Sequence, residues 1–191
     1  IRKDIVPATP EIKHEALEYY GLDPLYKHIF VVGGSLGSKT LNDAMKGWIL
    51  KGCPGGENVE VIWQCGKFYK GQIDAFMEEA KASGKPVEGI QHSDFIMRMD
   101  LAYAAADIVI SRSGASSVSE LCAAHKAVIF VPSPNVAEDH QTHNAMALVK
   151  RGAALVIEEK DLSGEMLCRK VKEVFAKVNG TAVLGENAKK M

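Results

Sequence analysis

Three loops rich in glycine, serine and amide residues carry the side chains that could do chemistry in this sequence. The first loop reads GGSLGS at 33–38 and lies between an apolar run and an amphipathic stretch. Glycines let a backbone approach a ligand closely, and the free N–H groups at the start of a helix favour an anion. We therefore predict a phosphate-binding loop formed by Gly33, Gly34 and Gly37, with the Ser35 and Ser38 hydroxyls as further donors. A tight strand-to-helix turn that binds nothing is the alternative.

This first loop comes close to the P-loop of nucleoside triphosphatases without matching it. The pattern GxxxxGK[ST] needs a glycine where Ser38 stands, and a side chain there would crowd the loop that wraps the phosphates. The order of the glycines also misses the GxGxxG dinucleotide fingerprint. A P-loop phosphotransferase is therefore only a distant alternative.

The second loop reads SRSGASS at 111–117 and also precedes a helical pattern. Ser113 is placed to cap that helix. Ser117 and Glu120 lie on one face of the helix, together with Ser116, while the apolar residues turn towards the core. A carboxylate there can accept two hydrogen bonds from neighbouring hydroxyls, as a ribose offers. A glutamate that only stabilises the helix dipole is the alternative.

The third loop reads PSPNVAED at 132–139 and leads into a helix start that carries His140, Gln141, His143 and Asn144. Gln141 and Asn144 are three residues apart, so they share a helix face and suit recognition of sugar hydroxyls and amides. The two histidines, with Asp139 before them, suggest a metal site. Their spacing is not that of the HExxH motif, however, and no further ligand is evident. We therefore predict polar ligand contacts and no metal, with ordinary helix-start polarity as the alternative.

The elements that must position these loops form one repeating pattern along the chain. Strands rich in Val and Ile alternate with helical stretches, which predicts a parallel sheet covered by helices on both faces. Ligands in such sheets bind outside the carboxyl ends of the strands, so the three loops meet at one edge. Together they describe a diphosphate flanked by a ribose and a hydroxyl-rich group. Strands are expected at 29–32, 59–63, 87–90, 107–111, 127–131 and 153–157, and helices at 11–20, up to 51, 68–83, 95–105, 116–125, 139–151 and 161–178.

Composition bounds the class of protein. The 191 residues fit one domain with a substantial core, and a net charge of −1 argues against nucleic acid as the main partner. No apolar run is long enough to span a bilayer. The four cysteines form no CxxC pair, which favours reduced core thiols in a cytosolic protein. We therefore expect a cytoplasmic location.

The motifs GGSLGS at 33–38, SRSGASSVSEL at 111–121 and VPSPNVAEDHQTHNAMAL at 131–148 resemble the MurG family. Its members are the N-acetylglucosaminyltransferases that make lipid II in bacterial cell-wall synthesis. The resemblance covers nearly the whole chain and corresponds to the C-terminal, donor-binding domain. It implies a Rossmann-like, doubly wound parallel sheet that is one half of a GT-B glycosyltransferase. Residues 1–191 would form a single UDP-sugar-binding domain, and the N-terminal acceptor domain would be absent.

The resemblance also implies a reaction. The donor would be UDP-N-acetylglucosamine and the acceptor lipid I, an undecaprenyl-diphosphate-linked N-acetylmuramoyl-pentapeptide. Transfer would invert the anomeric centre, without a cofactor, in peptidoglycan synthesis that supports cell shape and division. The missing domain would carry the acceptor site and the contact with the cytoplasmic face of the membrane. This chain alone would bind the UDP-sugar weakly and transfer nothing, and no residue in it is assigned as catalytic.

The resemblance assigns binding roles to individual residues of this sequence. Ser35 would face the diphosphate, Glu120 would bind the ribose hydroxyls, and Arg2 would reach the nucleotide. Phe95 and Ile96 match the segment that holds the uracil, largely through backbone groups. The N-acetylglucosamine would be held by His140, Gln141 and Asn144, and Ser113 and Ser117 complete the predicted set.

Two other functions fit the same pattern of loops. A UDP-N-acetylglucosamine 2-epimerase would bind the nucleotide on such loops but needs catalytic carboxylates and histidines around the sugar. A non-catalytic nucleotide-sugar-binding module is the second alternative. The abrupt start at Ile1 favours a missing partner domain over this second alternative.

Overall fold

A parallel sheet forms the centre of the computed structural model, which describes residues 8–34, 36–52, 58–112, 127–132 and 155–176. Within these residues the sheet has six strands in the order β3-β2-β1-β4-β5-β6, and every neighbouring pair is parallel. The predicted doubly wound sheet is therefore confirmed. The strands are β1 (Lys27–Val32), β2 (Val59–Gln64), β3 (Ile90–Ser93), β4 (Ile108–Ser111), β5 (Ala127–Phe130) and β6 (Leu155–Val156).

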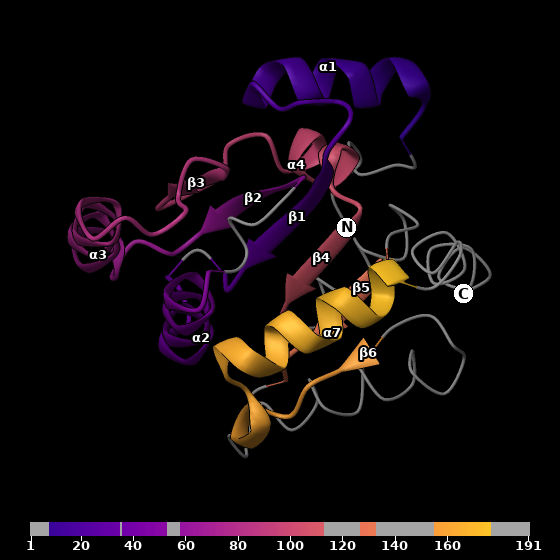
Figure 1. Cartoon of the computed structure of the whole chain (residues 1–191). Coiled ribbons are helices and arrows are strands. Elements are labelled where there is room, and N and C mark those ends of the chain that lie inside the picture. The colour runs from indigo at the N-terminus through magenta and orange to yellow at the C-terminus, as the bar shows by residue number, and fades with distance from the viewer. Residues whose placement is uncertain (1–7, 35, 53–57, 113–126, 133–154, 177–191) are drawn as a thin grey trace.

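Helices cover both faces of this sheet (Figure 1). In β1, Phe30 and Val32 pack towards α1 and α4, whereas Ile29 and Val31 pack towards α2, α3 and α7. Alternate residues of a strand point to opposite faces, so a strand buried on both sides reads as one continuous apolar run. The helices are α1 (Pro10–Tyr20), α2 (Lys39–Leu50), α3 (Lys70–Ala82), α4 (Met99–Ala105) and α7 (Gly164–Ala176), with the 3-10 turn η2 (Glu159–Asp161) before α7.

The ends of α1 follow the local sequence. The Thr9 hydroxyl accepts a hydrogen bond from the Ile12 N–H at 3.2 Å, and Pro10 occupies the first turn, where its missing N–H costs nothing. Gly21 ends the helix in the left-handed conformation, at φ 64°. The predicted helix that stops at Gly21 is confirmed. In the part of the chain that the structure describes, no helix is long and apolar enough to cross a bilayer.

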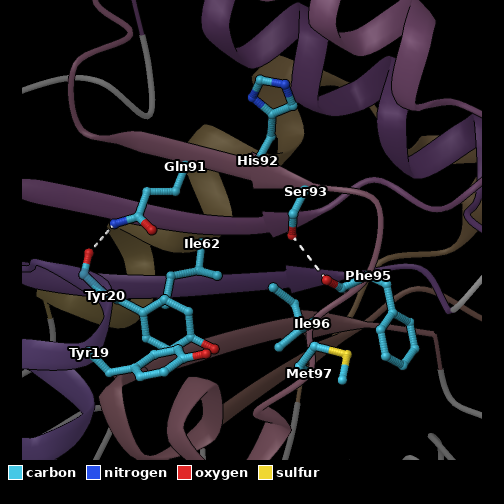
Figure 2. Close-up of a pocket in the computed structure, with 9 residues that line it drawn as sticks. All are labelled: Tyr19, Tyr20, Ile62, Gln91, His92, Ser93, Phe95, Ile96 and Met97. Atoms are coloured by element: carbon cyan, nitrogen blue, oxygen red, sulfur yellow. Dashed lines mark hydrogen bonds between the residues drawn. The ribbon is translucent and has the colours of Figure 1, made fainter.

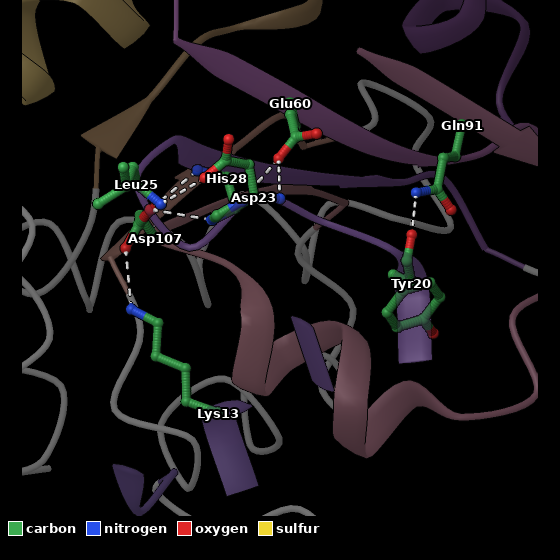
Figure 3. A network of polar contacts seen from close by, with 8 residues as sticks. All are labelled: Lys13, Tyr20, Asp23, Leu25, His28, Glu60, Gln91 and Asp107. Carbon is green, nitrogen blue, oxygen red and sulfur yellow. Dashed lines mark hydrogen bonds and ion pairs between the residues drawn. The ribbon is translucent and has the colours of Figure 1, made fainter. Parts of the chain in front are cut away.

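A buried histidine holds the amino-terminal edge of the sheet together (Figure 3). His28 Nε2 lies 3.1 Å from Glu60 Oε1, and the His28 backbone N–H donates to Asp107 Oδ2 at 2.8 Å. Glu60 also accepts from the Asp23 N–H at 2.8 Å, and Lys13 Nζ lies 3.7 Å from Asp107 Oδ1. These contacts join the start of β1 to β2 and to the residue before β4. The opposite, carboxyl-terminal edge is left for the loops that follow the strands.

Several predicted bounds differ from the observed ones by a few residues, and two elements overlap their predicted ranges least well at the start. The strand predicted at 87–90 is instead Ile90–Ser93, because the buried Val87 belongs to a turn in which its carbonyl accepts from the Ile90 N–H. The pairing with β2 continues through polar residues, which an apolar pattern does not mark. The helix predicted at 95–105 begins only at Met99, because Arg98 has the non-helical backbone angles φ −106° and ψ 70° and its carbonyl accepts the first hydrogen bonds of the helix, from the Leu101 and Ala102 N–H groups. The helices predicted at 116–125 and 139–151 lie outside the described residues.

Candidate functional site

The carboxyl ends of β1, β2, β3 and β4 bring several loops to one edge of the sheet (Figure 1). Five predicted site residues lie among the described residues there: Gly33, Gly34, Gly37, Phe95 and Ile96. The other predicted site residues lie outside the described residues: Arg2, Ser35, Ser113, Ser117, Glu120, His140, Gln141 and Asn144.

The glycine loop after β1 folds into a closed turn. Gly34 and Gly37 have φ values of 97° and 98°, which side-chain-bearing residues rarely adopt, and the Gly37 N–H donates to the Gly34 carbonyl at 3.2 Å. A Cβ at Gly37 would lie 2.5 Å from the Cys65 carbonyl oxygen. Gly37 is therefore required partly because the loop after β2, which contains Cys65, packs against it.

That neighbouring loop follows β2 and is held against α2. Gly66, at φ 93°, packs so closely on Gly37 that a Cβ would overlap the Gly37 Cα and N. The buried Asn42 of α2 donates to the Cys65 carbonyl at 2.8 Å and accepts from Trp63 Nε1 at 3.1 Å. The loops after β1 and β2 thus form one packed unit at the start of α2.

The start of α2 is capped by Ser38. The buried Ser38 Oγ accepts from the Leu41 N–H at 3.3 Å and from Arg112 Nη2 at 2.6 Å. Ser38 was singled out from the sequence as a hydroxyl donor for a phosphate, but the structure uses its oxygen as a helix cap. The backbone N–H groups at this helix start remain a favourable place for an anion, because the helix dipole is positive there.

Arg112 joins four segments at this edge. Its Nη1 donates to Glu159 Oε2 at 2.6 Å and to the Val131 carbonyl at 3.1 Å, while Nη2 bonds Ser38. Glu159 also accepts from the Thr40 hydroxyl at 3.0 Å. The Arg112 and Glu159 side chains are 18% and 22% exposed, so this pair is largely shielded from solvent. The arginine therefore positions the loops, and its charge is already matched by a carboxylate.

Gln64 connects the glycine loop to the segment after β3. Its Nε2 donates to the Gly34 carbonyl at 3.0 Å, and its Oε1 accepts from the Ile96 N–H at 2.8 Å. Neither Gln64 nor Arg112 was assigned a role from the sequence. The available signal was a polar residue at the end of an apolar strand, which does not name a partner.

The segment with Phe95 and Ile96 borders a cavity of about 230 Å³ (Figure 2). Ile96 is buried in the core, whereas Phe95 is 50% exposed and its ring is turned away from Tyr19 and Tyr20. A planar ring could enter this cavity beside aromatic side chains and backbone groups. The lining residues are Tyr19, Tyr20, Ile62, Gln91, His92, Ser93, Phe95, Ile96 and Met97.

Arg98, which follows the cavity-lining segment in the chain, forms an ion pair with Asp100. Arg98 Nε and Nη2 donate to the two Asp100 carboxylate oxygens at 3.0 and 2.9 Å, and these hydrogen bonds hold the pKa of Asp100 below its usual value. Burial raises the pKa of Tyr20 to about 12, and its hydroxyl donates to the Arg98 carbonyl at 3.2 Å. Among the described residues, no group of three or more His, Cys, Asp or Glu side chains could hold a metal ion. His140 and His143, which the sequence analysis considered as metal ligands and did not adopt, lie outside those residues.

Known proteins share both the sequence and the fold. The chain matches the glycosyltransferase family 28 C-terminal domain over residues 28–190. It is 48% identical over 174 residues to the UDP-N-acetylglucosamine--N-acetylmuramyl-(pentapeptide) pyrophosphoryl-undecaprenol N-acetylglucosamine transferase of Parabacteroides distasonis, which covers 91% of this chain and 45% of the relative. The transferase of the same name from Bacteroides fragilis is 41% identical over 187 residues, which cover 98% of this chain and 47% of that protein. This chain thus spans about half the length of the curated relatives it matches.

Solved structures of glycosyltransferases have the same fold as this chain. The crystal structure of Acinetobacter baumannii MurG superposes with a TM-score of 0.75 at 27% identity, over 100% of this chain and 51% of that one. WaaG, a glycosyltransferase of lipopolysaccharide biosynthesis, superposes at 0.72 with 16% identity, which shows a shared fold alone. The resemblance to the MurG family is confirmed, and the chain belongs to the glycosyltransferase family 28 C-terminal domains.

Proposed function

We propose that this chain is the donor-binding half of the transferase that moves N-acetylglucosamine from UDP-N-acetylglucosamine to lipid I. The observation that carries the proposal is the convergence of the glycine loop, the start of α2 and the Phe95–Ile96 segment at one sheet edge. The curated relatives that match nearly the whole chain carry this transfer in their names.

In this proposal, Gly33, Gly34, Gly37 and Ser35 face the diphosphate at the start of α2. Departure of UDP leaves negative charge on the diphosphate, and N–H groups already directed at that position would stabilise it without a metal. The acceptor hydroxyl attacks the anomeric carbon from the face opposite to the departing diphosphate, so the configuration inverts.

The Phe95–Ile96 segment would take the uracil. The Phe95 and Ile96 N–H groups donate to the Asp94 and Gln64 side chains, so the carbonyl oxygens are the backbone groups of these two residues that remain for a base. Carbonyl oxygens accept from the N3–H of uracil, which fits a uracil nucleotide. Arg2, Ser113, Ser117 and Glu120 would complete the nucleotide site, with Glu120 on the ribose.

The sugar would lie against His140, Gln141 and Asn144. The lipid acceptor and the contact with the cytoplasmic face of the membrane would belong to a further, N-terminal domain. This division predicts that the chain alone binds donor and transfers no sugar.

Calorimetric titration of the chain with UDP-N-acetylglucosamine, UDP-glucose and ATP tests the proposal. We expect both UDP compounds to bind, the N-acetyl sugar more tightly, and ATP not to bind. Glu120→Ala should weaken UDP binding, whereas Glu78→Ala, an exposed glutamate on α3, should not. Magnesium-dependent ATP binding would contradict the proposal, and conversion of UDP-N-acetylglucosamine to its 2-epimer by the full-length protein would support the epimerase instead.

A further inference from the structure

A cation and an anion of the protein both lie at the start of α2. The Arg112 guanidinium donates from Nη2 to the hydroxyl of Ser38, the residue that caps the helix, at 2.6 Å. The Glu159 carboxylate accepts from the hydroxyl of Thr40, the second residue of α2, at 3.0 Å. Arg112 and Glu159 also bind each other at 2.6 Å, so the two charges meet at the helix start.

The start of a helix is an unfavourable place for an arginine. The amino-terminal end of a helix carries a partial positive charge, which repels a cation and attracts an anion. Glu159 offsets the repulsion, because its carboxylate lies at the same helix start and is paired with Arg112. The Glu159 side chain is only 22% exposed, so solvent ions screen its charge weakly. The helix start therefore already holds one anion that belongs to the protein.

This internal anion lies in the region that the proposed function gives to the diphosphate. The glycine loop ends at Ser38, and the N–H groups proposed to bind the diphosphate follow directly in α2. The Glu159 carboxylate repels a diphosphate bound there, and it also cancels the attraction that Arg112 exerts on that diphosphate. The charge on Glu159 therefore acts against anion binding at this helix start.

We propose that Glu159 is an internal counter-anion that lowers the affinity of this site for the diphosphate of UDP and of the UDP-sugar. This inference rests on the proposed function. After transfer, UDP is held by the helix start and attracted by Arg112, and the carboxylate beside that arginine weakens the hold. Glu159 acts through Arg112 and through its own charge, so it sets the affinity and is not a catalytic residue.

Two glutamate variants that differ in exposure test the proposal. Glu159→Gln removes the charge and keeps an oxygen that can accept from Arg112 or Thr40. Glu158→Gln is the matched control, because Glu158 is the neighbouring residue, is 61% exposed and pairs with Lys160 at 3.3 Å. Calorimetry of the chain gives the dissociation constant of UDP, and displacement of UDP gives that of uridine, which has no phosphate. Thermal unfolding shows which variants are folded.

We expect Glu159→Gln to bind UDP about fivefold more tightly, the order of effect for one charge removed beside a partly shielded anion. Its affinity for uridine should equal that of the wild type. The gain for UDP should shrink as the salt concentration rises, because mobile ions screen the charges. Glu158→Gln should change neither affinity. Glu159→Ala removes the same charge and serves the same comparison if the glutamine variant does not fold.

Unchanged or weaker UDP binding by a folded Glu159 variant would overturn the inference and leave donor binding intact. A gain of equal size for uridine, or in Glu158→Gln, would also overturn it, because the effect would then not come from the carboxylate beside the diphosphate. Wild-type chain that binds no UDP would contradict the proposed function itself.

Discussion

Replacing Gly66 with alanine should destabilise this domain and weaken nucleotide binding together. Gly66 lies at φ 93°, and a Cβ there would overlap the Gly37 Cα and N and lie 2.6 Å from the Leu36 carbonyl carbon. All three atoms belong to backbone of the glycine loop, so no flexible side chain can move aside. The loop proposed to hold the diphosphate must shift to admit one methyl group.

The magnitude has two parts. Holding a residue with a side chain at this φ costs about 1–3 kcal/mol. Forcing extra volume into a packed region costs a further 1–3 kcal/mol or so, which brings the sum to about 2–6 kcal/mol. A domain whose free energy of unfolding lies at the low end of the usual range, about 5 kcal/mol, would survive a loss of about 2 kcal/mol and be largely unfolded by a loss of about 6 kcal/mol.

Gly84→Ala is the matched control. Gly84 follows α3 at φ 78°, but a Cβ there would meet nothing within 4 Å, so it measures the backbone strain without the clash. Urea unfolding should show that Gly66→Ala loses about 1–3 kcal/mol more than Gly84→Ala. Calorimetry should show weaker UDP binding for Gly66→Ala alone. Equal losses of stability in the two variants, with unchanged UDP binding, would refute the reasoning.

Three further predictions concern polar groups. Arg112→Met should lower the free energy of unfolding by about 3 kcal/mol because Glu159 stays shielded without its cation, and adding Glu159→Gln should recover part of that loss in urea unfolding. The raised pKa of Tyr20 means that the folded chain keeps a proton that the unfolded chain loses, so stability should fall from pH 10 to about 12, and Tyr20→Phe should flatten that fall. Hydrogen bonds from Arg98 lower the pKa of Asp100, so Asp100→Asn should reduce stability at neutral pH, and the difference from wild type should disappear as the pH falls below 3.8.

Several features of the fold were predictable because they depend on near neighbours in the chain. The apolar run of β1 reads directly as a strand buried on both faces, and Gly21 marks the end of α1. The strand β3 was misplaced because Val87 and Ile90 are buried on either side of a turn, whereas the edge strand continues through polar residues. An apolar pattern reports burial, and burial alone does not distinguish a turn from a strand.

The candidate site was also predictable only in part. The glycine loop and the Phe95–Ile96 segment were recognisable from motifs, but their relation to each other was not. Arg112 and Glu159 are 47 positions apart and Gln64 and Ile96 are 32 apart, so no local pattern links them. Their pairing follows from the register of parallel strands.

By itself the sequence determined the alternation of strands and helices, the placement of glycine-rich turns after strands, and membership of a family through three motifs. These properties follow from side-chain periodicity and turn chemistry, which act over a few residues. The tertiary structure alone decided that Ser38 caps α2, that Gly37 faces Gly66, and that Gln64 joins two loops. Such contacts depend on strand order and register, which bring side chains together only after the sheet has formed.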